Sequence, residues 1–280
     1  MSKYALLEKS ISKRDVRFGF VESKVPNTLS FATDAHNLGI ALANENIRWL
    51  IVPWELPVGN THKTMIFRDS HPKFKFIELC NSSPLTPKFP SQIDETVVVK
   101  EMSLISDFGV VIGKNTIVGR HVVIGEGVKI GDGCVIGDHV TLGNDSIYSE
   151  HNTKNFITLI HQGSVNIGPR VYIGSYTSID RSLFYGESTN IGSDNLIGAY
   201  CSFSHGVEVG NHNFFANNVL VAGYTRIENL NWFGPGVSTT HRLSIGSSNR
   251  ISIGSIIYRN IGSFQNIVSG RVAPKPNVSF

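Results

Sequence analysis

An aliphatic or aromatic residue recurs at every sixth position over most of the chain after residue 92. In the first run these anchor positions, each followed by glycine, are Ile112, Val118, Ile124, Ile130, Ile136 and Leu142. After an interruption the phase continues from Ile167 to Ile251, and in it only Thr239 is neither aliphatic nor aromatic. A period of six matches neither an α-helix nor a flat strand, so the pattern predicts a solenoid of short strands.

Three six-residue segments would close one triangular coil, with glycine, asparagine or aspartate at corners that need positive φ. The anchors, Tyr185 among them, are expected to point inward, and the strands to stack in parallel about 4.8 Å apart. The positions four residues after the first anchors are small or β-branched: Thr116, Val122, Val128, Cys134, Val140 and Ser146. Cys134 and Cys201 are expected to be core residues at such positions. Ile93, Val99 and Ile105 fit as earlier anchors if a bulge absorbs one extra residue before Ile112, so coiling should start near Ile93.

Residues 24–80 instead alternate short apolar runs with helix signals. Strands are expected at 29–32, 49–52 and 64–67, and helices after the candidate caps Asp34 and Ser70. The first helix should present Leu38, Ala41 and Leu42. The second should run to Cys80 and bury Phe74 and Ile77. These elements predict a small α/β domain.

The points where these two patterns stop predict the boundaries between the domains. Three prolines within residues 81–90 exclude a continuous helix or a central strand, so a linker is expected there. The expected parts are therefore residues 1–90, a β-helical domain at 91–262 with an inserted loop at 148–165, and a tail at 263–280. The inserted loop has either a functional role or none, and His161 in it is expected to be solvated or to touch substrate.

Composition narrows the class of protein. The 280 residues carry 25 basic and 22 acidic side chains, a net charge of +3 without a basic block, so nucleic-acid binding is not expected. Three cysteines without a CxxC pair argue against a disulfide framework or a structural zinc site and favour a cytoplasmic protein. No apolar run approaches the about 20 residues that cross a bilayer, so no membrane span is expected.

Several short sequences resemble one enzyme family. They are Phe203-Ser-His-Gly-Val207, Val221-Ala-Gly223 eighteen residues later, Ser178-Ile-Asp-Arg181 and Leu29-Ser-Phe31. They resemble elements of the UDP-3-O-acylglucosamine N-acyltransferases of lipid A synthesis and of related sugar N-acyltransferases. The resemblance implies a mainly β fold, the left-handed parallel β-helix of hexapeptide repeats with a small N-terminal α/β domain, and a homotrimer.

The resemblance also implies roles for individual residues. His205 falls on the catalytic histidine of the family, and the Gly223 backbone amide on the one that faces the reacting carbonyl. Residues 1–90 would bind the nucleotide sugar and the coil would bind the acyl thioester. The further candidates for substrate binding are Phe31, Asp180, Arg181, Glu187, His161 and His241.

The repeat itself leaves the roles of several candidates open. Glu187, Gly223 and His241 take the place of His205 in successive coils. Glu187 is expected to orient the His205 ring or to be solvated. His241, two coils or about 9.6 Å away, is too far for a direct hydrogen bond and contacts the pantetheine arm, the sugar or nothing. The neighbours at 180 and 181 bind substrate or form a corner salt bridge.

The positions at which this sequence differs from the family's motifs restrict the substrates that we expect. Ile197-Gly-Ala199 stands where the family usually has Ile-Asp-Asn, and His36 and Asn37 stand near where an aromatic residue sandwiches uracil. The ending at 268–276 resembles that of coenzyme A-dependent sugar acetyltransferases and leaves no room for the helices that meet acyl carrier protein. We therefore expect acyl-CoA as donor and a nucleotide-linked amino sugar as acceptor, in the synthesis of lipopolysaccharide, O-antigen or another surface glycan.

The expected chemistry needs a base, because a protonated amine cannot attack a thioester. An imidazole with an unperturbed pKa of about 6.5 accepts a proton near neutral pH and typically contributes about 10²–10⁴ in rate. No metal and no tightly bound cofactor are expected. The alternatives are a lipid A pathway enzyme that uses acyl carrier protein, a noncatalytic trimeric binding protein, and a metal-dependent carbonic anhydrase, which lacks a ligand because residue 246 is glycine.

Overall fold

The protein consists of two compact units. The computed structural model describes residues 4–12, 16–59, 61, 63–83, 88–269 and 271–273. Unit 1 comprises Met1–Thr86, Ile147–Gln162 and Leu183–Gly186, and unit 2 comprises Pro87–Ser146, Gly163–Ser182 and Glu187–Phe280. The chain therefore leaves the repeat region twice to complete unit 1. The predicted linker at 81–90 and the tail from 263 lie partly outside the described residues.

Unit 1 is an α/β domain around a four-stranded sheet, as predicted. Its strands are all parallel, in the order β1 (Arg17–Phe18), β2 (Thr28–Phe31), β3 (Ile47–Val52), β4 (Met65–Arg68). Its helices are α1 (Ala5–Ser12), α2 (Ala35–Ala43) and α3 (Pro72–Asn81). The three strands expected from the sequence correspond to β2, β3 and β4 within one residue at most ends.

Of the two predicted helix caps, one is confirmed and one is wrong. The Asp34 carboxylate accepts a hydrogen bond from the Asn37 N–H at 2.8 Å and caps α2, as predicted. Leu38 and Ala41 of that helix are buried, whereas Leu42 is exposed. The predicted cap of α3 by Ser70 is wrong, because the cap position is taken by His71 without a side-chain hydrogen bond.

Burial on α3 differs from the prediction by one side chain. Ile77 is fully buried as expected, but Phe76 takes the place in the core that was predicted for Phe74, which is only half-buried. The aromatic rings of Phe31 and Phe184 lie 5.1 and 5.7 Å from the Phe76 ring. The core of unit 1 therefore includes a residue from the second stretch that leaves the coil.

The first stretch that leaves the coil is a hairpin of unit 1 rather than an irregular loop. It pairs β14 (Ser149–His151) with β15 (Phe156–Thr158) in antiparallel register. The Asn81 side chain donates to the Thr158 carbonyl and accepts from the Ile160 N–H, both at 2.9 Å. His161 is 3% exposed, so the expectation that it is solvated is wrong.

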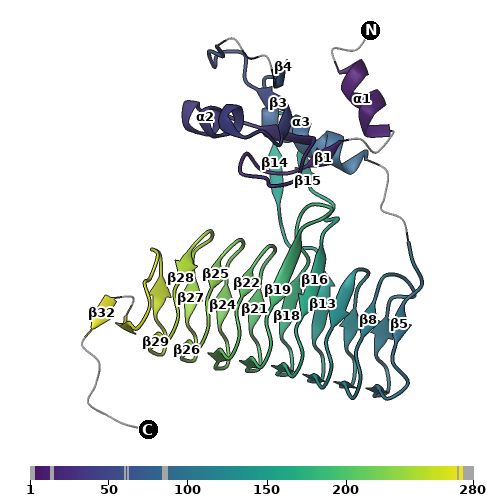
Figure 1. Cartoon of the computed structure of the whole chain (residues 1–280), viewed down its shortest axis with the longest axis vertical. Coiled ribbons are helices and arrows are strands. Elements are labelled where there is room, and N and C mark those ends of the chain that lie inside the picture. The colour runs from purple at the N-terminus through teal and green to yellow at the C-terminus, as the bar shows by residue number, and fades with distance from the viewer. Residues whose placement is uncertain are drawn as a thin grey trace. The chain divides into compact units, whose positions relative to one another are not determined.

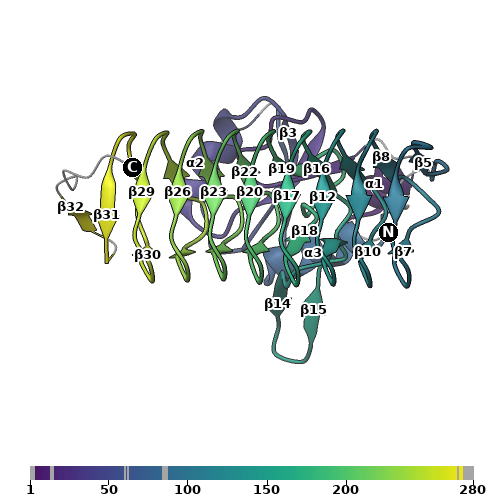
Figure 2. The ribbon, with the colours of Figure 1, turned by 90° about the horizontal axis from the view of Figure 1, so that it is seen from below.

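Unit 2 stacks coils that each give one strand to three sheets, as Figures 1 and 2 show. The first coil sheet comprises β5 (Gln92–Ile93), β8 (Val111–Ile112), β11 (Val128–Ile130), β16 (Ser164–Ile167), β19 (Ser188–Ile191), β22 (Glu208–Val209), β25 (Arg226–Ile227) and β28 (Ser244–Ile245). The second coil sheet comprises β6 (Val98–Val99), β9 (Ile117–Val118), β12 (Val135–Ile136), β17 (Tyr172–Ile173), β20 (Leu196–Ile197), β23 (Phe214–Phe215), β26 (Trp232–Phe233), β29 (Arg250–Ile251), β31 (Asn266–Val268) and β32 (Arg271–Ala273). The third coil sheet comprises β7 (Leu104–Ile105), β10 (Val123–Ile124), β13 (Thr141–Asn144), β18 (Ser178–Asp180), β21 (Ser202–Phe203), β24 (Leu220–Val221), β27 (Ser238–Thr239) and β30 (Ile256–Ile257). Neighbouring strands are parallel except β31 and β32.

The anchors form one continuous core inside these coils, as predicted. Phe203, Phe215 and Phe233 are fully buried, and the ring centroids of consecutive pairs lie 5.1 and 4.6 Å apart. Cys134 and Cys201 are buried in the same core, also as predicted. Stacked side chains of this kind supply most of the stabilisation of a solenoid, because each coil buries its apolar residues only against its neighbours.

The strand register confirms the one extra residue expected before Ile112 and shows a second, longer insertion after Ile167. Ile105 pairs with Ile124, so the first coil has one extra residue, whereas Ile112 pairs with Ile130, eighteen residues on. Ile167 pairs with Ile191, twenty-four residues on. Tyr185 lies in the extra segment and is 42% exposed, so its prediction as an inward anchor is wrong. An insertion of six residues preserves a six-residue phase and is therefore invisible to it.

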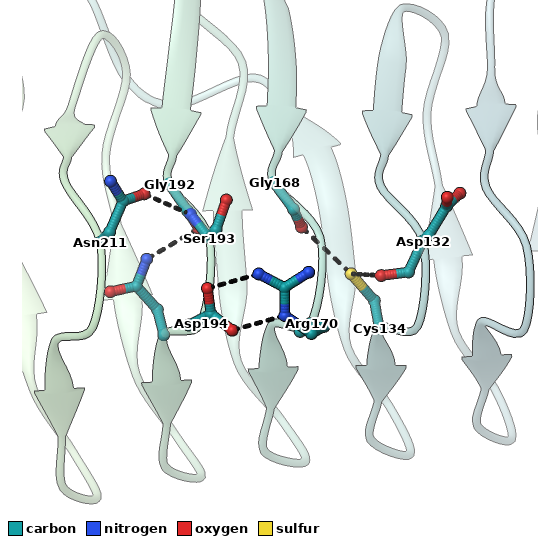
Figure 3. Close-up of polar contacts among 9 residues, drawn as sticks. Asp132, Cys134, Gly168, Arg170, Gly192, Ser193, Asp194 and Asn211 are labelled. Carbon is teal, nitrogen blue, oxygen red and sulfur yellow. Dashed lines mark hydrogen bonds and ion pairs between the residues drawn. The ribbon is translucent and has the colours of Figure 1, made fainter.

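Polar side chains at the corners tie each coil to the next. The Asn211 carboxamide oxygen accepts from the Ser193 N–H at 2.7 Å, and Arg170 forms two hydrogen bonds with Asp194 at 2.6 and 2.7 Å (Figure 3). A Cβ on Gly192 would meet the Asn211 oxygen at 2.5 Å, which explains the glycine after that anchor. Buried asparagines continue this pattern inside, where each side-chain oxygen accepts a backbone N–H from the next coil: Asn195, Asn213, Asn231 and Asn249.

None of the helices in the described part of the chain is both long enough and apolar enough to cross a membrane.

Candidate functional site

His205 lies at the corner between the third and the first coil sheet, two residues after the buried Phe203. Its Nδ1 is 2.6 Å from the Ser146 hydroxyl oxygen. Ser146 is the last residue of unit 2 before the first stretch that leaves the coil. The repeat had placed Ser146 at a small position like the buried Cys134, but its side chain is half-buried and meets the His205 ring instead. The missed signal is the end of the repeat directly after residue 146.

Gly223 lies one coil beyond His205, because Phe203 pairs with Val221. A Cβ on Gly223 would meet the His205 Nε2 at 2.7 Å and its Cδ2 at 3.0 Å, so only glycine lets the imidazole lie against this backbone. The Gly223 carbonyl accepts from the Arg242 N–H at 2.9 Å. Among the hydrogen bonds of the described residues none is donated by the Gly223 N–H, which leaves this donor for a ligand.

Glu187 is not at the place that the repeat predicted for it. Ile179 pairs with Phe203, so the register puts Arg181 rather than Glu187 one coil before His205. The Glu187 carboxylate accepts from the Tyr224 hydroxyl at 2.9 Å and from the Ser182 hydroxyl at 3.1 Å.

Tyr224 connects Glu187 to the histidine. The Tyr224 ring meets the His205 ring edge-on, with centroids 5.5 Å apart and an interplanar angle of 71°. Tyr224 follows the predicted Gly223 directly but was not among the residues expected at the site. Burial raises the pKa of Glu187, against the effect of the hydrogen bonds from Tyr224 and Ser182. Burial and the nearby Glu187 charge raise the pKa of Tyr224, so it stays a neutral donor.

Asp180 and Arg181 do not form the corner salt bridge that one interpretation of the sequence allowed. Arg181 Nε donates to the Gly143 carbonyl at 2.8 Å and lies 3.6 Å from the Asp145 carboxylate. Burial, and to a lesser extent the Asp145 charge, raise the pKa of Asp180 to about 6. No hydrogen bond to the Asp180 carboxylate occurs within the described part of the chain.

The other predicted site residues are distributed over both units. His241 is exposed two coils beyond His205 on the same corner, as the repeat predicted. Phe31 and His161 belong to unit 1, where Phe31 packs 6.5 Å from the Phe20 ring and His161 is buried. Unit 2 therefore brings together the histidine, the glycine amide and, through Tyr224, Glu187. No group of three or more histidine, cysteine or acidic side chains that could hold a metal ion occurs among the described residues.

Comparisons with known proteins agree with this fold. The family model described as bacterial transferase hexapeptide (six repeats) matches residues 109–144 and 188–223, and the second stretch contains His205 and Gly223. No curated protein matches the chain. The chain thus carries the hexapeptide repeat of bacterial transferases in the two regions that flank the exits from the coil.

The chain is also similar to several solved structures. The UDP-N-acetylglucosamine acyltransferase from Campylobacter jejuni is 20% identical over 65% of this chain and 73% of that chain, with a TM-score of 0.51. LpxA from Acinetobacter baumannii is 25% identical over 62% and 69%, with a TM-score of 0.46. The acetyltransferase domain of PglB from Neisseria gonorrhoeae, in complex with acetyl coenzyme A, is 12% identical over 88% and 98%, with a TM-score of 0.21. The first likeness shows the fold, a left-handed parallel β-helix, as the resemblance had implied.

Proposed function

We propose that this protein is an N-acyltransferase that moves an acyl group from acyl-CoA to the amine of a nucleotide-linked amino sugar. One observation carries the proposal: the His205 imidazole is held by Ser146 on one nitrogen, and its other nitrogen lies against the backbone of Gly223. A base and an amide donor in adjacent coils are the two groups that acyl transfer requires. The match to a transferase repeat supports the same reaction class.

The reaction follows from this geometry. His205 Nε2 takes a proton from the sugar amine as the amine attacks the thioester carbonyl. The carbonyl oxygen becomes an oxyanion, which the Gly223 N–H stabilises by a hydrogen bond. Collapse of the tetrahedral intermediate breaks the carbon–sulfur bond, and the departing thiolate takes the proton from the His205 imidazolium. The amide and free coenzyme A are the products.

The acceptor sugar is proposed to meet Asp180 and Arg181. Burial disfavours the ionised form of Asp180, and a buried carboxylate without a hydrogen-bond donor destabilises the fold. A bound ligand could supply that donor through a sugar hydroxyl or an ammonium group, which supports a binding role for Asp180. His241, farther along the same corner, is assigned to the donor arm. Glu187 acts on His205 only through Tyr224.

Unit 1 is proposed to bind the nucleotide. Its sheet is parallel, and parallel sheets bind ligands at the carboxyl ends of their strands, where β2 ends at Phe31. His161 is buried within the same unit and shapes it rather than facing solvent. Three free cysteines, all buried, agree with a reaction in a reducing cytoplasm.

A homotrimer is part of the proposal because one face of unit 2 is apolar. The outward residues of the second coil sheet in successive coils are Val98, Ile117, Val135, Tyr172, Leu196, Phe214 and Trp232. An apolar stripe of this length marks an interaction surface, and closed symmetry favours like copies. Light scattering at assay concentration should show a trimer, and a monomer would contradict this assembly.

The test of the activity compares two histidines. Purified protein is screened against nucleotide amino sugars with short and hydroxylated acyl-CoAs, and free thiol release is measured. His205→Ala should lower kcat by about 10²–10⁴ with little change in acceptor KM, because the base acts on the transition state. The control is His212→Asn, at an exposed left-handed corner elsewhere in unit 2. A trimeric His205→Ala protein within about threefold of wild type would refute the proposed base.

A further inference from the structure

We propose that the Ser146 hydroxyl is a positioning group that fixes His205 in the tautomer with the proton on Nδ1 and the lone pair on Nε2. The inference rests on the proposed function, since it names what prepares the base for that reaction. A histidine acts as a base only through the nitrogen that carries no proton, so catalysis through Nε2 requires the Ser146 hydroxyl to accept from Nδ1–H rather than to donate to Nδ1.

The distances support a strong interaction at Nδ1. The separation of 2.6 Å between the Ser146 oxygen and Nδ1 is slightly shorter than the about 2.7–3.2 Å that is usual for N–H···O hydrogen bonds. During the reaction His205 becomes an imidazolium with a proton on each nitrogen, so the group at Nδ1 must then accept. A serine oxygen can accept both before and after proton transfer, so it stabilises the charged intermediate without having to reorient.

The surroundings fix the ring plane independently of Ser146. Gly223 lies against Nε2 and Cδ2, and the Tyr224 ring meets the imidazole edge-on. Tyr224 is itself anchored by its hydrogen bond to Glu187. A Cβ on Gly206 would meet the Tyr224 ring at 2.7 Å, so this packing is tight. Removal of the Ser146 hydroxyl should therefore change the tautomer and the charge balance of His205 while the ring stays in place.

The neutrality of serine has its own consequence. A carboxylate beside Nδ1 would favour the protonated imidazole by its charge, and the base would then be lost at higher pH. A hydroxyl stabilises the imidazolium only by its dipole, so more of the enzyme carries the free base near neutral pH. Substitution of Ser146 by an acid therefore tests the role through the pH profile, which a purely structural role would not move.

The experiment compares Ser146→Ala and Ser146→Asp with wild type and with Ser188→Ala. Ser188 hydrogen bonds to Ser164 on the first coil sheet and is the matched control for loss of a half-buried hydroxyl. Ser146→Ala should lower kcat by about 10–100-fold at unchanged acceptor KM, as expected for a lost hydrogen bond to a charged group. Ser146→Asp, which can only accept, should keep more activity than Ser146→Ala and shift the acid limb of the kcat profile to higher pH.

A second measurement separates this inference from the proposed function. In ¹⁵N-histidine-labelled protein, His205, assigned by its loss in His205→Ala, should show a protonated Nδ1 in wild type and a mixed or reversed tautomer in Ser146→Ala. Wild-type kcat and tautomer in Ser146→Ala, or a Ser146→Asp protein as inactive as Ser146→Ala, would overturn the role of Ser146. Absence of thiol release by wild type with every substrate would refute the proposed function and leave the tautomer measurement to decide the positioning alone.

Discussion

The coils after Glu187 and the stretch between Leu142 and Ile191 contribute to one core but differ in regularity. From Ile191 onward, anchors pair at intervals of eighteen residues, through Val209, Ile227 and Ile245. Between Leu142 and Ile191 the chain leaves the coil twice to complete unit 1. The regular coils contribute His205, Gly223 and Tyr224, whereas their partners Ser146, Ser182 and Glu187 stand at the points of departure and return.

The exits from the coil bring together side chains that the repeat alone does not. In the regular coils the inward side chains have repeated roles, since anchors fill the core and buried asparagines bond the next coil. A position released from the repeat can meet a neighbour that no repeated position would meet. In the proposed reaction, the regular coils supply the base and the amide donor, and the residues at the exits from the coil orient them.

The largest loss of stability should come from the substitution of an anchor in the regular coils. Phe215→Ala removes a fully buried ring that stacks 4.6 Å from Phe233. The free energy of unfolding, measured by urea denaturation, should fall by about 3–5 kcal/mol. Phe215→Leu retains most of the volume and should lose less than about 1.5 kcal/mol. A loss below about 1.5 kcal/mol for the alanine variant would mean that the core tolerates cavities and that the stacking is not its main support.

A glycine beside the site should give the next largest effect. Gly206 has φ +67° and a Cβ there would meet the Tyr224 ring, whereas Gly254 has φ +64° and nothing within 4 Å. Gly254→Ala should therefore lose about 1–2 kcal/mol for the left-handed conformation alone. Gly206→Ala should lose about 1–3 kcal/mol more, because the ring must move. Equal losses in thermal or urea unfolding would show that the Tyr224 packing is loose.

The sequence predicted the regular part well for a physical reason. Almost every anchor is apolar because it is buried, with Thr239 as the exception, so the period alone located the core and the three parallel sheets. The same period placed Gly223 one coil from His205, and the register confirms that placement. In unit 1, Asp34 was found as a cap because its side chain acts on backbone only three residues away.

The irregular part could not be read in the same way. An insertion of six residues keeps the phase, so Tyr185 looked like an anchor and Glu187 like the equivalent of His205. Ser146 fitted a core position by its spacing, although the repeat ends directly after it. Tyr224 and Asp180 depend on contacts or burial that arise between coils, and no spacing along the chain encodes them.

A smaller effect should appear as a pH dependence of stability. The pKa of Asp180 is raised from 3.8 to about 6 in the folded protein, mainly by burial, so the folded state binds this proton more tightly than the unfolded state. Wild type should therefore lose up to about 3 kcal/mol relative to Asp180→Asn as the pH rises from below 4 to above 6. Urea unfolding of both proteins at pH 4 and pH 7.5 measures this difference. If the difference in unfolding free energy between wild type and Asp180→Asn were the same at both pH values, the carboxylate would be solvated.

The smallest effect should come from Tyr185, and it tests the comparison most directly. Its exposed ring lies in the second stretch that leaves the coil and packs under the Arg17 guanidinium, whose carbon is 4.9 Å from the ring centroid. Tyr185→Ala should lose at most about 1 kcal/mol, the range for an exposed cation–π contact, and Tyr185→Phe, which keeps the ring, close to nothing. Ile191→Ala, at the true anchor of that sheet, should lose about 2–5 kcal/mol. If Tyr185→Ala lost as much as Ile191→Ala, Tyr185 would be an inward anchor after all. The coil would then keep eighteen residues there, and Glu187 would return to the place beside His205 that the repeat had first predicted.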